Sequence, residues 1–182
     1  MAVFFLLRIF FGLLKYNKNK SDFFGVNNLD KNKNFRWDNF IFNLLIAEGG
    51  GFLSSILSGN IGEKYNNLAR PDFSAPGFIF PIVWVTLYFL LALSNSLISN
   101  DNQANKLYFM GLLINFLWPI FFFGLELRLF AFVWLLFLIL LNIIIARRFF
   151  KENFVSGFLT LIYILWLIYA GYLNFGVWLL NK

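Results

Sequence analysis

Cysteine and histidine are both missing from this chain of 182 residues. Their absence excludes disulfides, thiolate nucleophiles, imidazole bases and the usual cysteine and histidine ligands of zinc and haem iron. We therefore expect no hydrolytic triad, no catalytic residue and no metal site. A GxxxxGK[ST] phosphate-binding loop is also missing, so ATP-driven transport by this chain alone is not expected.

Charged residues are scarce, and four long segments contain no Asp, Glu, Lys or Arg: residues 78–98, 107–125, 129–146 and 154–180. A helix needs about 20 apolar residues to cross the hydrocarbon core of a bilayer, so each segment predicts a membrane span. Residues 40–61 predict a fifth and weaker span, because they include Glu48 and three consecutive glycines. The segments lack the alternation of membrane β-strands, which leaves helices as the spanning structure.

Hydrophobic residues make up 60% of the chain, more than a soluble domain of this length can bury. We therefore expect an all-α membrane protein whose five-transmembrane-helix bundle occupies residues 39–182. Residues 1–38 form a short N-terminal extension, in which residues 2–14 predict an interfacial anchor and the Asn- and Lys-rich residues 15–38 a flexible tether. A sixth span at residues 2–14 stays open as an alternative.

The net charge of +6 indicates orientation in the membrane rather than binding to nucleic acid, because basic residues gather on the inner side of membrane proteins. With five spans, and with Arg8 set aside, ten basic residues lie on the side of the N-terminal tail and four on the other. We therefore expect the tail inside and the loop of residues 62–77 outside. The lipid bilayer is an expected partner, and nucleic acid is not.

Small residues recur at every fourth position along two adjacent stripes of the first span: Gly50, Ser54 and Ser58, and Gly51, Ser55 and Gly59. Small residues let helix backbones approach closely within a membrane. We therefore predict that both stripes are buried against another helix.

Three prolines, Pro71, Pro76 and Pro81, punctuate the loop and the start of the second span, in the sequence KYNNLARPDFSAPGFIFPIVWVTLY. Proline disfavours the helical conformation in the residue before it, so we expect an extended chain here and a helix that begins only beyond Pro81. This stretch resembles that of the translocator protein family, the TspO or tryptophan-rich sensory proteins, which reads approximately WYxxLxKPxxxPPxWVFxPVWTxLY.

Two later spans resemble the same family, so the resemblance covers roughly residues 45–181. Residues 115–124 read NFLWPIFFFG, similar to the family's LNxxWxPxFFG. The last span is similar to PYLxWxxFAxxLNxxIWxLN at Tyr163, Trp166, Ala170, Asn174 and Trp178. The chain departs from the family pattern at Lys64, Ala75, Phe78 and Ile162. Three of these departures lie in or next to the first long loop, so the loop can cap a pocket differently here.

The resemblance implies a five-helix bundle, commonly a homodimer, that binds a tetrapyrrole between its helices beneath the first long loop. By the same resemblance, the pocket is lined by Tyr65, Trp84, Asn115, Trp118, Trp166 and Ala170. Indole faces in an apolar cleft suit the stacking of a flat porphyrin-type macrocycle. The competing interpretation is that the aromatic residues face lipid or anchor the bundle at the membrane interface, and that Asn115 only joins helices.

The function implied by the resemblance is that of a membrane receptor or regulator of tetrapyrroles such as protoporphyrin or haem, with no cofactor required. Two alternatives stay open: transport or export of tetrapyrroles or other small hydrophobic ligands, and light- or oxygen-dependent degradation of porphyrins through Trp radicals. A purely structural membrane scaffold is the remaining interpretation. The bacterial inner membrane is favoured over the mitochondrial outer membrane, because the tail resembles no transit peptide.

Overall fold

Helices account for all regular structure in the computed structural model, which describes residues 36–98 and 102–182. In chain order they are α2 (Trp37–Leu57), α3 (Ile61–Asn67), α4 (Ile79–Ser96), α5 (Asn102–Pro119), the π-helix η1 (Ile120–Gly124), α6 (Arg128–Glu152) and α7 (Phe154–Leu180). Counting α5 and η1 as one, five of them are long and apolar enough to cross a membrane. The prediction of an all-α fold with five spans is therefore confirmed. The predicted anchor at residues 2–14 lies outside the described residues.

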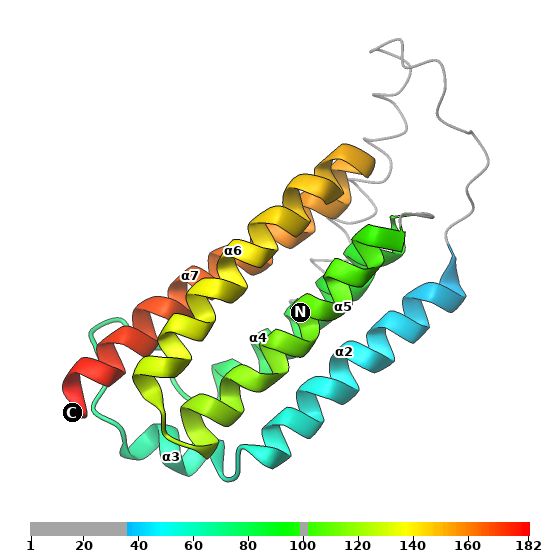
Figure 1. The fold of residues 1–182 in the computed structure, drawn as a ribbon. Helices are drawn as coiled ribbons and strands as arrows, with labels where there is room; N and C mark the ends of the chain where they lie inside the picture. The colour runs from blue at the N-terminus through cyan, green and yellow to red at the C-terminus, as the bar shows by residue number, and fades with distance from the viewer. Residues whose placement is uncertain (1–35, 99–101) are drawn as a thin grey trace. The chain divides into compact units, whose positions relative to one another are not determined.

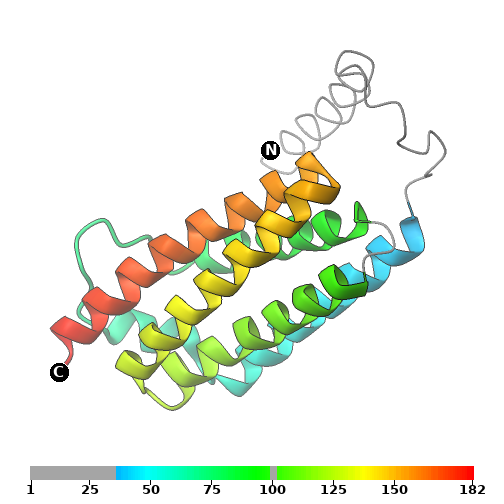
Figure 2. The same cartoon turned by 45° about the horizontal axis from the view of Figure 1, so that its top comes forward.

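The five long helices lie side by side in one bundle (Figures 1 and 2). Around it, α2 contacts α4 and α5, α4 contacts α7, and α6 joins α7 to α5. One end holds α3, the loop of residues 68–78, η1 and the C-terminus, and we call it the loop end. The opposite end, where α2, α5 and α7 begin and α4 and α6 finish, is called the tail end.

The first span finishes earlier than its apolar run. Gly59 adopts a left-handed backbone with φ of 80°, a conformation that commonly terminates helices and that glycine adopts without strain. Asn60 then caps α3, because its Oδ1 accepts a 3.3 Å hydrogen bond from the Glu63 backbone N–H. Its Nδ2 also donates to Glu63 Oε2 at 2.9 Å. The predicted boundary at residue 61 is therefore too late, since Ile61 already belongs to α3.

The second span begins earlier than expected. We predicted a helix only beyond Pro81, but α4 starts at Ile79, so Pro81 is its third residue. The backbone N–H groups of the first helical turn have no partner inside the helix, and a proline there therefore breaks no helical hydrogen bond. The prolines thus limit the irregular chain to the loop before α4 without delaying the helix.

The third span changes its helical pitch where it reaches Pro119. The chain continues as η1, whose turn closes with a 2.8 Å hydrogen bond from the Leu125 N–H to the Ile120 carbonyl, five residues back. Single π-turns of this kind often mark functional sites. Here the wider turn lies at the loop end of the bundle, next to α2 and α6.

The last two spans differ in how well their ends were predicted. Helix α6 runs on past residue 146 through Arg147 and Arg148 to Glu152, since basic side chains are tolerated in the last turns of a helix. Helix α7 covers residues 154–180, as predicted. Asn153 caps it, because its Oδ1 accepts hydrogen bonds from the Val155 and Ser156 N–H groups at 2.9 and 3.2 Å.

Small hydroxyl side chains join α4 to α7 at the tail end. The Ser94 hydroxyl lies 2.9 Å from the hydroxyls of both Ser156 and Thr160, and all three residues have no exposed surface. The Ser156 hydroxyl donates to the Ser94 carbonyl at 2.7 Å. We call these three residues the hydroxyl cluster. Side chains this small bring the two backbones close together, where dispersion and hydrogen bonds can hold them.

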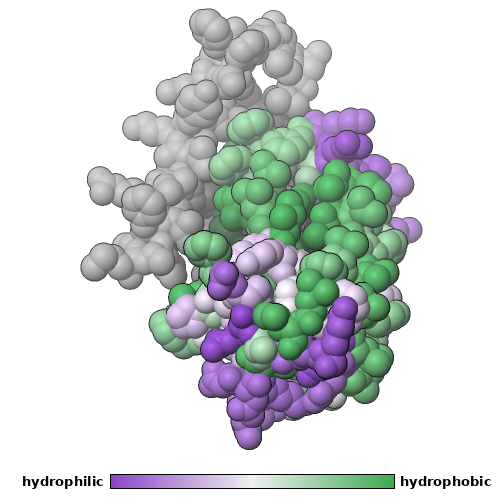
Figure 3. All heavy atoms as spheres, turned by 90° about the vertical axis from the view of Figure 1, so that its left-hand side faces the viewer, coloured by the Kyte–Doolittle hydropathy of each residue, from purple (hydrophilic) through white to green (hydrophobic). Residues whose placement is uncertain are grey.

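The flanks of the bundle are apolar on every long helix. Large exposed side chains include Phe52 on α2, Ile82 on α4, Leu113 on α5, Leu140 on α6 and Leu165 on α7. Looking onto the loop end, Figure 3 shows hydrophobic residues along the flank and hydrophilic residues gathered below them. Lipid solvates such flanks, which explains why so much apolar surface stays outside the core.

Candidate ligand-binding site

Helix α4 presents a row of aromatic side chains to the inside of the bundle at the loop end. Phe80, Trp84 and Tyr88 are spaced four residues apart, so they share one face of the helix. The Trp84 ring lies 5.6 Å from that of Tyr88 and 6.5 Å from that of Trp118 on α5, between ring centroids. The Phe80 ring lies 6.0 Å from Trp166 on α7. We call these five residues the aromatic cluster.

The six residues predicted to line the pocket lie in or beside this cluster. Trp84, Trp118 and Trp166 are members of it. Tyr65 of α3 reaches it through Phe80, at 5.0 Å between ring centroids. Asn115 of α5 reaches it through Tyr88, to whose hydroxyl its Nδ2 donates at 3.0 Å. Ala170 is buried on α7, one turn beyond Trp166.

Two buried polar atoms beside the cluster have no hydrogen-bond partner within the described residues. They are the Trp166 indole nitrogen Nε1 and the Asn115 side-chain oxygen Oδ1. By contrast, the Trp118 indole donates to Asn174 Oδ1 at 3.0 Å. A buried donor or acceptor without a partner costs roughly 1–3 kcal/mol. One unsatisfied donor and one unsatisfied acceptor are therefore ready to receive polar groups of a ligand.

Within the aromatic cluster, Trp84 contacts Tyr88 and Trp118, and Phe80 contacts Trp166. The groove at the loop and a small cavity at the tail end are lined by none of the six predicted residues. The larger is an open groove of about 1070 Å³ along the loop, beside Arg70, Phe73 and Phe78. A macrocycle bound between the helices would therefore have to displace rings that now touch.

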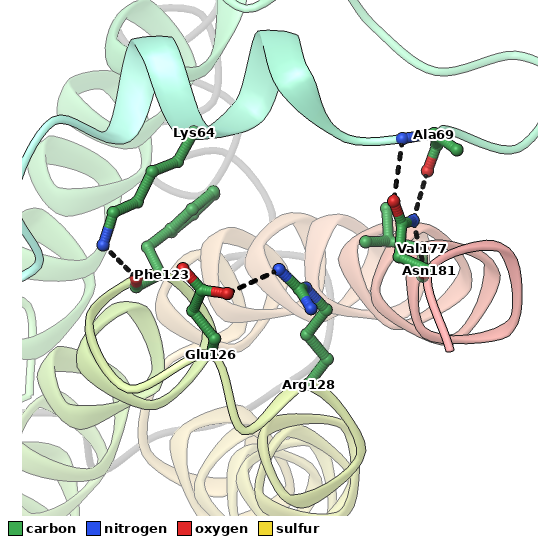
Figure 4. Close-up of polar contacts among 7 residues, drawn as sticks. All are labelled: Lys64, Ala69, Phe123, Glu126, Arg128, Val177 and Asn181. Carbon is green, nitrogen blue, oxygen red and sulfur yellow. Dashed lines mark hydrogen bonds and ion pairs between the residues drawn. The ribbon is translucent and has the colours of Figure 1, made fainter.

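Three side chains, two on α7 and one just past its end, bind the backbone of the loop that follows α3. Asn181, just past the end of α7, makes a pair of hydrogen bonds with Ala69, accepting from its N–H at 3.0 Å and donating to its carbonyl at 2.8 Å (Figure 4). The Tyr172 hydroxyl donates to the Asp72 carbonyl at 2.7 Å. The Tyr169 hydroxyl also binds the loop backbone: it donates to the Phe73 carbonyl at 2.9 Å and accepts from the Ala75 N–H at 3.1 Å. We call Tyr169, Tyr172 and Asn181 the loop tie.

A glycine on α7 lets the loop approach closely between these bonds. A Cβ atom added at Gly176 would lie only 2.5 Å from Cγ of Pro71, a ring that cannot swing away. Any larger residue at this position would therefore push the loop off the helix.

Helix α3 is fastened to its surroundings at two adjacent residues. Lys64 donates through Nζ to the Phe123 carbonyl at 2.6 Å, at the end of the π-helix (Figure 4). The neighbouring Tyr65 donates to the Ala75 carbonyl at 2.7 Å. Lys64 was one of the departures from the family pattern, and the structure gives it a contact that connects α3 to η1.

The small residues of α2 meet the helices that carry the cluster. A Cβ atom at Gly50 would clash with the Phe116 ring of α5, and one at Gly51 with the Tyr88 ring of α4. Ser54 is buried, and its hydroxyl donates to the Phe116 carbonyl. Ser55 is exposed, so the second stripe packs at Gly51 but not one turn later. Helix α2 therefore packs against the aromatic cluster where Gly51 meets the Tyr88 ring.

Sequence comparison identifies the family. A model of the TspO/MBR family matches residues 42–179, which hold all six predicted site residues. The chain belongs to the TspO/MBR family. With five apolar helices, it is an integral, multi-pass membrane protein. The resemblance found in the sequence is thereby confirmed.

Individual relatives give the same result. Protein CrtK of Rhodobacter capsulatus is 34% identical over 128 residues, which cover 66% of this chain and 79% of that protein. The tryptophan-rich protein TspO of Archaeoglobus fulgidus is 30% identical over 137 residues, which cover 72% of this chain and 89% of that protein. A tryptophan-rich sensory protein of Cereibacter sphaeroides is 31% identical over 122 residues, which cover 65% of this chain and 77% of that protein.

Phe80 and Tyr88 are cluster members that the TspO resemblance did not single out. Their spacing from Trp84, four residues on either side, already placed them on the same helix face. The loop tie left no comparable signal. Its side chains bind backbone groups about 100 residues earlier in the chain, for instance Tyr172 to Asp72. A local sequence pattern cannot predict a contact between segments so far apart.

Proposed function

We propose that this TspO-family protein is a membrane receptor or regulator that binds a tetrapyrrole at the loop end, between α4, α5 and α7. The observation that carries the proposal is the aromatic cluster with its two unsatisfied polar atoms, on Trp166 and Asn115. Rigid indole and phenyl rings offer faces on which a flat macrocycle can stack. The unpaired N–H and amide oxygen can receive the few polar groups that orient a ligand in an apolar site.

The contacts between the rings indicate how binding proceeds. Trp84 and Trp118 contact each other in this structure. A ligand that binds between them has to separate the two rings, so that each ring contacts the ligand instead. Such an exchange involves side-chain rotations rather than helix unfolding, and it leaves little apolar surface exposed in either state. The loop lies over Tyr65 and is tied to α7, so it would open for entry and close again over the bound ligand.

The full-length protein, purified in detergent and titrated with protoporphyrin IX, haem and a sterol, tests the proposal. We expect saturable quenching of Trp fluorescence by the tetrapyrroles and none by the sterol. A quenching curve that stays linear and unsaturated for both tetrapyrroles would contradict the proposal.

The same protein in sealed vesicles separates a receptor from the other activities. A receptor should neither move protoporphyrin across the bilayer nor bleach its absorbance under light. Net flux would instead support a transporter, and light-dependent loss of the absorbance band would support degradation.

A further inference from the structure

A small cavity lies on the tail-end side of the aromatic cluster, about one helical turn beyond Tyr88 along α4. It is lined by residues of α4, α5, α6 and α7, and it leaves about 10 Å³ of room for the centre of a water molecule. Its lining is mostly apolar but includes Tyr108, Asn142 and Tyr163. Cavities lined only by apolar groups stay dry, whereas this size with several polar groups is what a single buried water requires.

The Tyr108 hydroxyl is the first reason to expect a ligand here. The residue is 3% exposed, and its hydroxyl has no hydrogen-bond partner in residues 36–98 and 102–182. Inside a bilayer no solvent can supply the missing bond, so the hydroxyl needs an internal partner. A phenol that served only for packing would be replaced by phenylalanine without loss, and the hydroxyl therefore requires an explanation.

The amide of Asn142 is the second reason. Its Nδ2 donates to the Leu138 carbonyl of its own helix at 2.9 Å, and its acceptor Oδ1 lies 4.0 Å from the place of a Cβ atom on Gly111 of α5. Asn142 is buried on α6, while Tyr108 is on α5, so a molecule touching both would connect two helices. Tyr163 brings a third polar group from α7.

Gly111 is the residue that leaves the space. A Cβ atom added there would lie 3.2 Å from Cδ1 of Ile145 and 4.0 Å from both amide atoms of Asn142. An alanine at this position would therefore occupy part of the room beside the amide. The glycine, the phenol and the amide together make a site with both volume and polar partners.

We propose that this cavity is a binding site for one water molecule, which bridges the Tyr108 hydroxyl and the Asn142 amide oxygen and so connects α5 to α6. Water is the ligand because the room suits one small molecule, and because water both donates and accepts hydrogen bonds. This water site does not depend on what binds at the loop end.

A crystal structure of the full chain at a resolution that shows ordered water tests the site directly. We expect a density peak within hydrogen-bond distance of the Tyr108 hydroxyl and of Asn142 Oδ1, and its loss in Gly111→Ala. The absence of a peak in the wild-type protein, or a Tyr108 hydroxyl bonded to a protein acceptor instead, would overturn the proposal.

Stability supplies a second test, because the sign of the effect differs between a wet and a dry cavity. If water is bound, Tyr108→Phe removes one of its partners, and the unfolding equilibrium should shift roughly 3- to 10-fold toward the unfolded state. If the cavity is dry, the same change removes an unsatisfied hydroxyl, and stability stays equal or rises, which would refute the site. Gly49→Ala is the control for Gly111→Ala, because a Cβ atom at Gly49 meets nothing within 4 Å.

Discussion

The two ends of this bundle are held together by different kinds of contact. At the loop end, α4, α5 and α7 meet through large aromatic rings with centroids 6.0 to 6.5 Å apart. The loop above these rings is held by the loop tie, whose side chains bind the loop backbone. At the tail end, α4 and α7 meet through the hydroxyl cluster, whose oxygen atoms lie 2.9 Å apart. Aromatic contacts survive small rotations, whereas short hydroxyl contacts between close backbones do not. The loop end is therefore suited to rearrangement around a ligand, and the tail end to keeping the helices in register.

The largest effect on stability is expected at the tail end. Ser156→Leu would force a large side chain into a site with no exposed surface and would remove the hydrogen bonds to Ser94. Overpacking of this kind costs about 1–3 kcal/mol, occasionally more. The thermal unfolding midpoint in detergent measures the loss. Ser55→Leu is the matched control, since Ser55 is exposed on α2. Equal midpoints for the two variants would contradict the tail end's role in holding the helices.

The next effect concerns ligand affinity at the loop end. Trp84→Ala removes a ring at the centre of the aromatic cluster, and stacking contacts are worth about 0.5–1.5 kcal/mol beyond burial, so protoporphyrin should bind several-fold to tenfold more weakly. The titration of Trp fluorescence measures the change. Trp134→Ala serves as the control, because Trp134 contacts Phe121 and Phe130 outside the cluster. A weaker affinity in Trp134→Ala alone would place the ligand elsewhere.

The loop tie should govern rates more than affinity. Asn181→Ala removes both bonds to Ala69, so the loop should open more often, and protoporphyrin should bind and dissociate faster. Two exposed hydrogen bonds contribute about 1–3 kcal/mol at most. Stopped-flow quenching measures both rates, with Asn67→Ala at the exposed end of α3 as the control. Unchanged rates in Asn181→Ala would mean that the loop does not limit entry.

The smallest effect is expected for the contact between α3 and η1. Lys64→Met keeps the length of the side chain but removes the bond to the Phe123 carbonyl. A charged donor such as Lys64 can contribute more than a neutral one, but because this bond is only partly buried, solvent screening should keep its contribution to about 0.5–1.5 kcal/mol. The unfolding midpoint should fall by at most a few degrees, while the affinity for protoporphyrin stays within about twofold of the wild-type value. A tenfold loss of affinity would show that Lys64 takes part in binding.

Sequence alone predicted the spans well because hydropathy and length decide whether a helix crosses a bilayer. Boundaries failed where a local signal was misjudged. Gly59 and Asn60 already indicated the end of one helix and the cap of the next, and Pro81 was compatible with a first helical turn. The contacts of Tyr172 and Asn181 with the loop could not be predicted, because they depend on how segments distant in sequence meet.

Hydrogen exchange with and without saturating protoporphyrin tests the contrast between the two ends most directly. Ligand binding should slow the exchange of α3, the loop of residues 68–78 and the loop-end turns of α4, α5 and α7. The turns around Ser94 and Ser156 should exchange at the same rate with and without ligand. Protection centred on those tail-end turns, or a loop whose exchange is unaffected at saturation, would contradict a ligand site formed by the aromatic cluster.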